Sequence, residues 1–379
     1  MSKRPQGLRT WIEIDKKAVE NNYRVFRSLI SKNTKLMAVV KSNAYGHSLI
    51  DFSKEISALG ADWLGVDSAT EALALRKADV KKPILILGYT LPEMVSEVAD
   101  NDINFTISSF DQLKELENIE TKKPKSIHIK VDTGMSRQGF LAEDLENLIS
   151  QLKNLQTSEL IIGGLYTHFA MAKNPSFPQF TKIQLERFQK WTNAFHQAGF
   201  KPIVHASATG GAILYPEAHF DMVRIGIGLY GIWPSKETEA FAKDKIKLQP
   251  ALSWRAIISE VKKLPKGAKI GYDCTETLDR ELVIAICPIG YWHGFPRAFS
   301  SIGRVIIGGE MARVLGRVSM DMLILDVTGI PHVKIEDEVT IIGKDGESAI
   351  TIDSASGIID MSSYELVTRI NPLIKRIYK

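Results

Sequence analysis

The chain has 379 residues, of which 44% are hydrophobic and 24% are charged, and its formal net charge is +4. At this length a single hydrophobic core usually stops growing, so we expect two domains. The positive charge is spread in short clusters such as Lys122 and Lys123. Such clusters are typical of solvated surface, and we expect no nucleic-acid partner.

The amino terminus and the cysteines favour a cytoplasmic location. No apolar run follows the basic residues at the start of the chain, so we expect no secretory signal. The most apolar stretch, 282–290, is interrupted by Pro288 and predicts no membrane span. Cys274 and Cys287 have neither metal nor redox spacing, and we interpret both as packing residues in a reducing compartment.

Up to about residue 230, short apolar runs alternate with longer amphipathic stretches such as 69–78 and 184–197. This alternation predicts a parallel sheet with helical crossovers. Eight strands in that length favour a closed (β/α)8 barrel, and an open doubly wound sheet is the alternative. The expected strands are 36–41, 62–67, 83–88, 103–107, 126–132, 160–168, 201–207 and 221–226.

The sequence pattern changes after Trp233. Residues 235–250 are polar and end in proline, as expected of a connecting segment. Short β-type runs then follow, separated by Gly, Pro and Asp turns. They are 252–264, 281–289, 304–309, 312–318, 322–327 and 338–343. We therefore predict a barrel domain at 1–245 and a mostly-β domain at 246–379.

The segment MAVVKSNAYGHS, 37–48, reads as a buried strand that ends in Lys41 and precedes a helix starting near Tyr45. Burial of a lysine at a strand end can depress its pKa, and such lysines often act as bases or form Schiff bases. The alternative is a lysine that extends to the surface.

Other polar residues also lie in or just after expected strands. Arg137 follows the fifth and His168 ends the sixth, while His205 lies in the seventh and Arg224 in the eighth. Each alone is explained by structural hydrogen bonds or ion pairs. In a barrel, however, the carboxyl ends of the strands form the active face. Cationic groups without clustered carboxylates predict a pocket for an anionic ligand and no metal site.

Gly226, Gly228 and Gly231 match the G-x-G-x-x-G pattern of dinucleotide-binding proteins. We reject that interpretation because Ile232, Trp233 and Pro234 stop the helix that the pattern requires. Backbone N–H groups near Gly226 that approach a phosphate are the preferred interpretation.

Seven segments, in order and near the expected spacing, resemble the alanine racemase family. They are MAVVKSNAYGHS, VDTGMSRQGF (131–140), GLYTHFA (164–170), MVRIGIGLYG (222–231), PIGYWHG (288–294), GRVSMDM (316–322) and SSYELV (362–367). The resemblance runs from about Thr10 to the end of the chain.

The resemblance implies that Lys41 holds pyridoxal 5′-phosphate covalently and, once released, acts as a base on one face of the substrate. The second base is Tyr272 of the partner subunit, so the active sites of a homodimer are shared. His168 and Arg224 assist that tyrosine. Arg224 faces the pyridine nitrogen and, because arginine keeps its proton, leaves that nitrogen unprotonated. The ring is then a weaker electron sink, which restrains side reactions.

The resemblance also nominates residues that bind the two anionic groups. For the cofactor phosphate these are Tyr45, Thr209, Gly226, Ile227 and Tyr364. For the substrate carboxylate they are Arg137 and the backbone N–H of Met320 of the partner subunit. Tyr291, Arg297 and Arg317 are expected at the entrance.

The chain departs from the family pattern at several positions. Ala208 stands where an asparagine is usual, and Ser136 where glycine is usual. Trp292 and His293 replace Ala-Asp, and Lys173 replaces an acidic residue, which bears on substrate preference. A further hypothesis is that Lys130 is carbamylated and steadies Arg137.

The implied function is interconversion of L- and D-alanine by a two-base mechanism, supplying D-alanine for peptidoglycan. A racemase for another amino acid or with broad specificity is the nearest alternative. A pyridoxal-phosphate-dependent decarboxylase fits less well, because the motif order differs. A non-catalytic pyridoxal-phosphate carrier resembles the barrel alone.

Overall fold

The computed structural model describes residues 5–155 and 159–379, which divide into two compact units. The barrel unit comprises residues 18–44 and 49–249, and the β unit comprises residues up to Lys17, 45–48 and 250–379. The split differs from the predicted one, because two early segments belong with the carboxyl-terminal residues.

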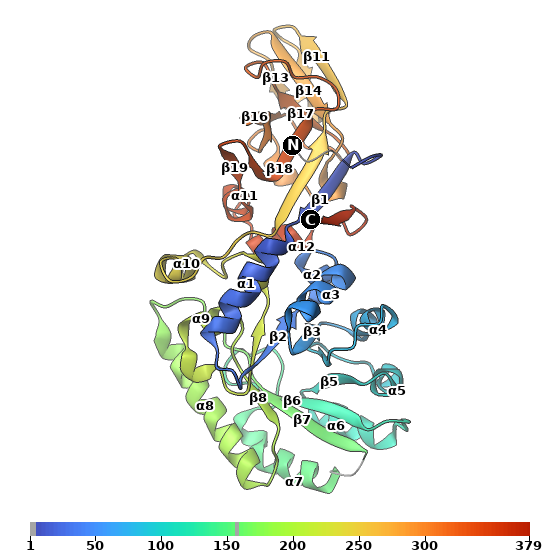
Figure 1. Cartoon of the computed structure of the whole chain (residues 1–379), viewed down its shortest axis with the longest axis vertical. Helices are drawn as coiled ribbons and strands as arrows, with labels where there is room; N and C mark the ends of the chain where they lie inside the picture. Colours follow the sequence, from blue (N-terminus) through green and yellow to red (C-terminus); the bar gives the residue numbers. More distant parts are fainter. Residues whose placement is uncertain (1–4, 156–158) are drawn as a thin grey trace. The chain divides into compact units, whose positions relative to one another are not determined.

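The barrel unit is a closed ring of eight parallel strands in chain order (Figure 1). The strands are β2 (Lys35–Val39), β3 (Trp63–Val66), β4 (Ile84–Ile86), β5 (Ile103–Ile107), β6 (Lys125–Lys130), β7 (Leu160–Tyr166), β8 (Ile203–His205) and β9 (Met222–Ile225). Each lies within an expected run or one residue outside it. Because β2 pairs with β9, with Met37 opposite Arg224, the ring is closed. The barrel prediction is confirmed, and the open-sheet alternative is wrong.

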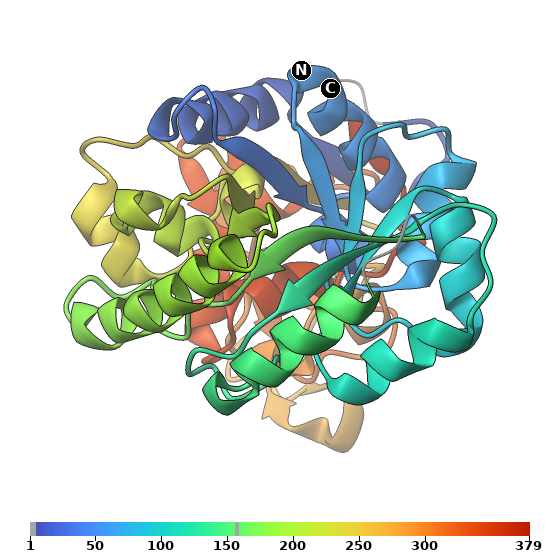
Figure 2. The same cartoon turned by 90° about the horizontal axis from the view of Figure 1, so that it is seen from below.

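Helices lie outside the ring of strands, as the view in Figure 2 shows. They are α1 (Lys16–Leu29), α3 (Leu49–Leu59), α4 (Ala69–Lys77), α5 (Pro92–Asp100), α6 (Phe110–Glu115), α7 (Leu145–Leu155), α8 (Pro178–Gln197), α9 (Thr209–Leu214) and α10 (Lys236–Ala242). The helices expected at 69–78 and 184–197 are confirmed as α4 and the later part of α8. Among these helices none is long and apolar enough to cross a membrane.

Residues 235–250 are not purely a connecting segment, because they contain α10. The side chain of Ser235 accepts a hydrogen bond from the backbone N–H of Thr238 at 3.1 Å. It also donates to the backbone carbonyl of Lys173 at 2.7 Å. This serine cap satisfies one of the free N–H groups of the first helical turn, so a short polar helix forms where composition indicated a linker.

The β unit is built on one large sheet. Its strand order is β11 (Glu260–Leu264), β14 (Leu282–Cys287), β17 (Leu323–Asp326), β16 (Glu310–Leu315), β15 (Arg304–Ile307), β18 (Glu338–Asp345), β10 (Leu252–Ile257), β1 (Thr10–Ile14) and β20 (Arg376–Tyr378). In addition, β19 (Ser348–Ile350) pairs with β18, and β12 (Lys269–Ile270) pairs with β13 (Glu276–Thr277). Two short helices complete the unit, α11 (Ile352–Ile358) and α12 (Ser363–Thr368).

Each of the six β-type runs expected after residue 250 overlaps at least one strand, which confirms the mostly-β prediction. Strands β20 and β1 of this sheet lie outside every expected run, and of these β1 comes from the predicted barrel domain. It is antiparallel to β10, with Ile12 opposite Trp254, and parallel to β20 (Figure 1). This pairing explains why the first residues belong to the β unit.

Candidate active site

The predicted lysine lies at the carboxyl end of the first barrel strand. Lys41 follows β2, and its Nζ forms an ion pair with Oδ1 of Asp67, which follows β3, at 2.9 Å. The Lys41 side chain is 38% exposed, so it is neither buried nor free in solvent. Asp67 had no assigned role, although an acid at the end of the run 62–67 was a usable signal.

The chain turns left-handed directly after Lys41, and this corrects the expected helix near Tyr45. Ser42, Asn43, Ala44 and Tyr45 have φ values of 56°, 56°, 51° and 50°, and the next helix, α3, begins at Leu49. Left-handed backbone costs an L-residue roughly 1–2 kcal/mol. The carboxylate of Glu71 offsets part of this by accepting the N–H of Ser42 at 2.7 Å. It also accepts the N–H of Asp67 at 2.8 Å.

Arg224, on β9, is buried, and every partner of its guanidinium among the described residues is neutral. Its Nη2 donates to the carbonyls of Thr167 and Ala206, both at 2.8 Å, and shares a hydrogen with Nδ1 of His168 at 3.3 Å, while Nη1 donates to Nδ1 of His205 at 2.9 Å. Burial lowers its pKa to about 10, so the group is still protonated at neutral pH. Nε–H and one Nη1–H form no hydrogen bond within the described chain.

His168 is a neutral imidazole. Burial, followed by the charge of Arg224, lowers its pKa to about 3. Because arginine only donates, Nδ1 of His168 is the acceptor in their contact, which places the ring proton on Nε2. Further cations at the barrel mouth contribute to the same pKa shift, namely Arg137, Lys130 and Lys41. The structure therefore gathers the predicted cationic residues around His168.

Lys130 ends β6 inside this cationic group. Its Nζ lies 5.6 Å from the centre of the Tyr166 ring and donates to Oε1 of Gln138 at 3.2 Å. Burial lowers the pKa of the amine to about 8, and the charges of Arg137 and Arg224 add to the effect. An amine with this pKa is partly neutral near pH 7.5, which carbamylation requires.

Arg137 is held in a loop that one carboxylate organises. Asp132 accepts the backbone N–H groups of Gly134 at 2.7 Å, Met135 at 2.8 Å and Arg137 at 3.0 Å. Burial raises the pKa of Asp132, but these backbone hydrogen bonds outweigh it, and the net pKa is lowered. Ser136, where the resemblance leads us to expect glycine, has φ 55°, a conformation that favours glycine.

The predicted phosphate residues of the barrel unit lie together. The N–H groups of Gly226 and Gly228 point at Oγ1 of Thr209, at 3.2 and 3.4 Å. A Cβ at Gly228 would lie 2.3 Å from the Phe26 ring, so a side chain is excluded there. Only a short 3₁₀ turn, Ile227–Tyr230, follows Gly226, which agrees with rejecting the dinucleotide pattern. Ala208 at the start of α9 provides no side-chain cap.

These groups fit a phosphorylated pyridine aldehyde. Lys41 provides an amine for the aldehyde, and Arg224 has N–H groups left to donate to a ring nitrogen. Thr209 and the N–H groups near Gly226 provide donors for a phosphate. The absence of a carboxylate among the described partners of Arg224 leaves its charge available to such a ring.

Tyr45 and Tyr364 lie together in the β unit, with ring centres 6.1 Å apart. Segment 45–48 is held there because Gly46 packs on the backbone of Val367 and its carbonyl accepts Nε–H of Arg376 at 2.9 Å. Burial raises the pKa of the Tyr364 phenol, so its hydroxyl remains protonated and can donate a hydrogen bond.

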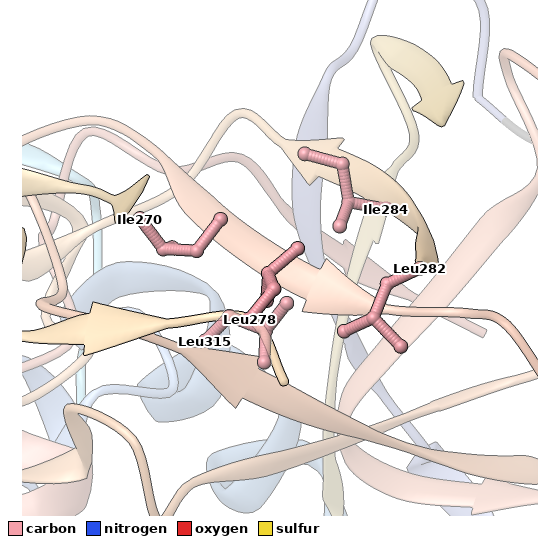
Figure 3. Packing of buried hydrophobic residues seen from close by; sticks show 5 residues of the cluster. All are labelled: Ile270, Leu278, Leu282, Ile284 and Leu315. Atoms are coloured by element: carbon pink, nitrogen blue, oxygen red, sulfur yellow. The ribbon is translucent and has the colours of Figure 1, made fainter. Parts of the chain in front are cut away.

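Tyr272 stands at the tip of the β12–β13 hairpin, and its side chain is 70% exposed. The base of the hairpin packs on a cluster of Ile270, Leu278, Leu282, Ile284 and Leu315 (Figure 3). The hairpin is also tied by Glu276, which accepts the N–H of Gly316 at 2.6 Å. Cys274 at the same tip is exposed, so the packing prediction is wrong for this cysteine, while Cys287 is buried.

Met320 lies in an exposed turn that is joined to a second turn by backbone hydrogen bonds. The N–H groups of Tyr291 and Trp292 donate to the carbonyls of Ser319 and Met320, both at 3.1 Å. His293 is buried in this turn, and its Nδ1 accepts the N–H of Gly290 at 3.2 Å. The side chain of His293 thus helps to fix the turn beside Met320, whereas Trp292 contributes a backbone N–H.

The remaining entrance residues are exposed or partly exposed. Arg317 forms an ion pair with Asp273, next to Tyr272, at 3.0 Å. Arg297 begins a 3₁₀ turn, Arg297–Phe299, in the β unit. The Lys173 side chain is exposed, and its backbone carbonyl accepts a hydrogen bond from Oγ of Ser235, the residue that caps α10.

Two models of the alanine racemase family match the chain. The amino-terminal domain model covers residues 14–234, and the carboxyl-terminal domain model covers residues 251–378. An alanine racemase of Methanococcus maripaludis is 41% identical over 97% of this chain and 98% of its own length. One from Leptospira interrogans is 37% identical over 97% of this chain and 95% of its own.

Solved structures agree with these matches. An alanine racemase of Clostridium difficile 630 superimposes with a TM-score of 0.93 at 29% identity, covering 99% of this chain and 97% of that one. The Bacillus anthracis alanine racemase with bound L-Ala-P also has a TM-score of 0.93, at 31% identity, covering 99% and 96%. With both family models matched and relatives above 30% identity along nearly the whole chain, this protein belongs to the alanine racemase family.

Proposed function

We propose that the protein interconverts L- and D-alanine with pyridoxal 5′-phosphate as cofactor, with Lys41 and Tyr272 of the partner subunit as the two bases. The observation that carries the proposal is the barrel mouth. There the amine of Lys41, just after β2, and a buried arginine whose partners among the described residues are all neutral are gathered around neutral His168.

When bound, pyridoxal phosphate supplies an electron-withdrawing ring that acidifies the Cα–H of the amino acid attached to it. Arg224 then has a defined task. Because its other partners are neutral, it donates an N–H to the ring nitrogen without giving up its proton. A ring that stays unprotonated withdraws electrons less strongly, so the proton must return quickly, and two bases provide for that.

His168 supports the second base through its tautomer. Its Nδ1 accepts from Arg224, so Nε2–H is the group left to donate to a phenol oxygen. A donated hydrogen bond stabilises the phenolate and lowers the pKa of a tyrosine from its usual value near 10. Tyr272 of the partner subunit then takes a proton from, or returns one to, the face of Cα opposite Lys41.

The remaining residues bind and orient. Arg137, held by Asp132, pairs with the substrate carboxylate together with the backbone N–H of Met320 of the partner subunit. Tyr45, Thr209, Gly226, Ile227 and Tyr364 bind the phosphate. Asp67 holds Lys41 at the strand end before the cofactor binds. In this proposal residues 1–245 provide most of the cofactor-binding groups, and residues 246–379 add Tyr364 and complete the site of the partner.

A homodimer follows from the proposed mechanism, since one subunit would hold only one base on each site. The exposure of Tyr272 and Met320, at 70% and 52%, supports an intermolecular role, because large apolar side chains in such positions often mark an interface. We further propose that the D-alanine supplies peptidoglycan synthesis.

A panel of L-amino acids, incubated with the holoenzyme and analysed by chiral chromatography, tests the proposal. D-alanine is expected as the main product, and Lys41→Ala abolishes it while Lys35→Ala, at the start of the same strand, does not. Borohydride reduction should fix the cofactor at Lys41. Equal turnover of larger amino acids would favour the broad-specificity alternative, to which Lys173 and Trp292 point. Loss of carbon dioxide, or no product, would refute racemisation.

A further inference from the structure

A chain of three buried side chains crosses the interior of the barrel. Nη1 of Arg224, on β9, lies 2.9 Å from Nδ1 of His205, on β8. Nε2 of His205 lies 2.9 Å from Nδ1 of His128, on β6. Both histidines are fully buried. His128 has no part in the proposed reaction, and nothing in its sequence surroundings distinguishes it.

The direction of every hydrogen bond in this chain follows from arginine, which can only donate. Nδ1 of His205 is therefore the acceptor, and the ring proton of His205 is on Nε2. That N–H donates to Nδ1 of His128, so the proton of His128 is also on Nε2. Within the described residues Nε2 of His128 has no partner, and the chain ends there.

The surroundings hold the His128 ring in this orientation. A Cβ at Gly164 would lie 2.1 Å from Nδ1 of His128, so only glycine admits the ring at this point of β7. Trp63 packs edge-on against the ring at 5.4 Å between ring centres. On the other side of the chain, Tyr166 stacks on His205 at 4.7 Å with 6° between the planes.

Neither histidine can gain a proton without breaking the chain. A second proton on His205 would have to sit on Nδ1, which faces the guanidinium of Arg224. A second proton on His128 would sit on Nδ1, which faces an N–H. Burial and the charge of Arg224 act in the same sense, lowering the pKa of His128 to about 3 and that of His205 well below its ordinary value.

We infer that His128 is a positioning residue: it holds His205 in the tautomer whose Nδ1 accepts from Arg224, and thereby fixes the guanidinium as an uncompensated donor at the barrel mouth. If Nε2 of His205 lost its acceptor, the ring could carry its proton on Nδ1. That N–H would oppose the guanidinium, and Arg224 would turn away. The role of Arg224 as a donor to the cofactor rests on the proposed function, but the tautomers of the two histidines do not.

Two substitutions of His128 separate the effect of its hydrogen-bond acceptor from the effect of the space that its ring fills. In His128→Asn the amide oxygen lies close to the position of Nδ1 and can still accept. His128→Leu fills similar space without an acceptor. The matched control is His219→Asn, because His219 is also buried in the barrel unit, but its ring bonds only the carbonyl of Ala212 among the described residues, at 2.9 Å.

The test is ¹⁵N solid-state NMR of holoenzyme labelled at histidine, combined with titration of the apoenzyme with pyridoxal phosphate. In the wild type, His128 and His205 should each show a pyridine-type Nδ1 and a pyrrole-type Nε2. In His128→Leu the His205 tautomer should change and the cofactor dissociation constant should rise about tenfold, the effect of losing one hydrogen bond worth roughly 1.4 kcal/mol. His128→Asn and His219→Asn should keep the wild-type His205 signal and affinity.

A pyrrole-type Nδ1 on His205 in the wild type would overturn the inference, and this measurement needs no variant to fold and no racemase activity. Unchanged His205 signals and cofactor affinity in His128→Leu would overturn it as well. So would a His128→Asn protein as impaired as His128→Leu, since the acceptor would then not matter. A protein with the expected tautomers but no racemisation would refute the proposed function alone.

Discussion

The carboxylate of Asp132 accepts the backbone N–H of Arg137 at 3.0 Å and, with its other oxygen, the N–H groups of Gly134 and Met135. One side chain thus sets the path of the loop that carries the expected carboxylate-binding arginine. The position proposed for substrate binding by Arg137 therefore depends on Asp132.

Asp132→Asn should weaken substrate binding more than chemistry. The amide can replace only one acceptor oxygen, and a hydrogen bond to a charged group contributes roughly 1.5–3 kcal/mol. We expect KM for alanine to rise about tenfold or more with a smaller change in kcat. Steady-state kinetics measures this, with Asp144→Asn as control, because Asp144 accepts the N–H of Leu141 at 2.7 Å in a neighbouring turn. Equal effects of the two substitutions would contradict the role.

Tyr272→Phe should remove one of the two bases and leave cofactor binding intact. The phenyl ring keeps the apolar contacts of the exposed hairpin tip but has no proton to exchange. We expect racemisation to fall by about 10² or more, as is typical when a general acid or base is lost, with exchange of Cα–H in D₂O lost for one enantiomer only. Wild-type turnover in this variant would eliminate the proposed second base.

Lys130 should make the stability of the protein depend on pH in the alkaline range. Its pKa is about 8 in the folded chain, against an ordinary lysine pKa of 10.5, so the unfolded chain binds more protons between these values. Stability therefore rises with pH from about 8 to 10.5 and is lower below 8. Denaturant unfolding across this range should show the rise in the wild type and lose it in Lys130→Met.

The same amine should react with carbon dioxide. Its neutral form attacks the carbon atom, a C–N bond forms, and one proton is released to solvent, which leaves an anionic carbamate beside Arg137. With ¹³C-bicarbonate, a new carbamate resonance is expected in the wild type and absent in Lys130→Met. A resonance that persists in the variant would place the modification elsewhere.

Ser136→Gly should stabilise the protein. Ser136 has φ 55°, and left-handed backbone costs a residue with a Cβ roughly 1–2 kcal/mol, part of which glycine loses again through the entropy of the unfolded chain. A net gain of about 0.5–1 kcal/mol is expected in denaturant unfolding. Ser136→Ala is the control, because it keeps the Cβ and should give no gain.

Much of the fold was predictable because its signals are local. An apolar run such as Ile103–Ile107 is buried along its whole length in the barrel, and strands of this kind can be recognised in the sequence without their neighbours. The polar residues that follow such runs, Lys41 and His168 among them, could be assigned to one face for the same reason. The resemblance then supplied roles for them.

What escaped prediction depends on partners that are distant in the chain. The left-handed turn at Ser42 relies on the carboxylate of Glu71, and β1 joins a sheet whose other strands come more than two hundred residues later. Composition carries no trace of either contact.

By itself, the sequence determined the alternation of strand and helix, the change to β structure after residue 250 and the residue types at the strand ends. These features follow from the pattern of apolar and polar residues that are neighbours in the chain. Only the tertiary structure decided which of those groups meet. The packing of β6, β8 and β9 in one barrel brings Arg224, His205 and His128 into contact, and the ionic and tautomeric state of each depends on that contact.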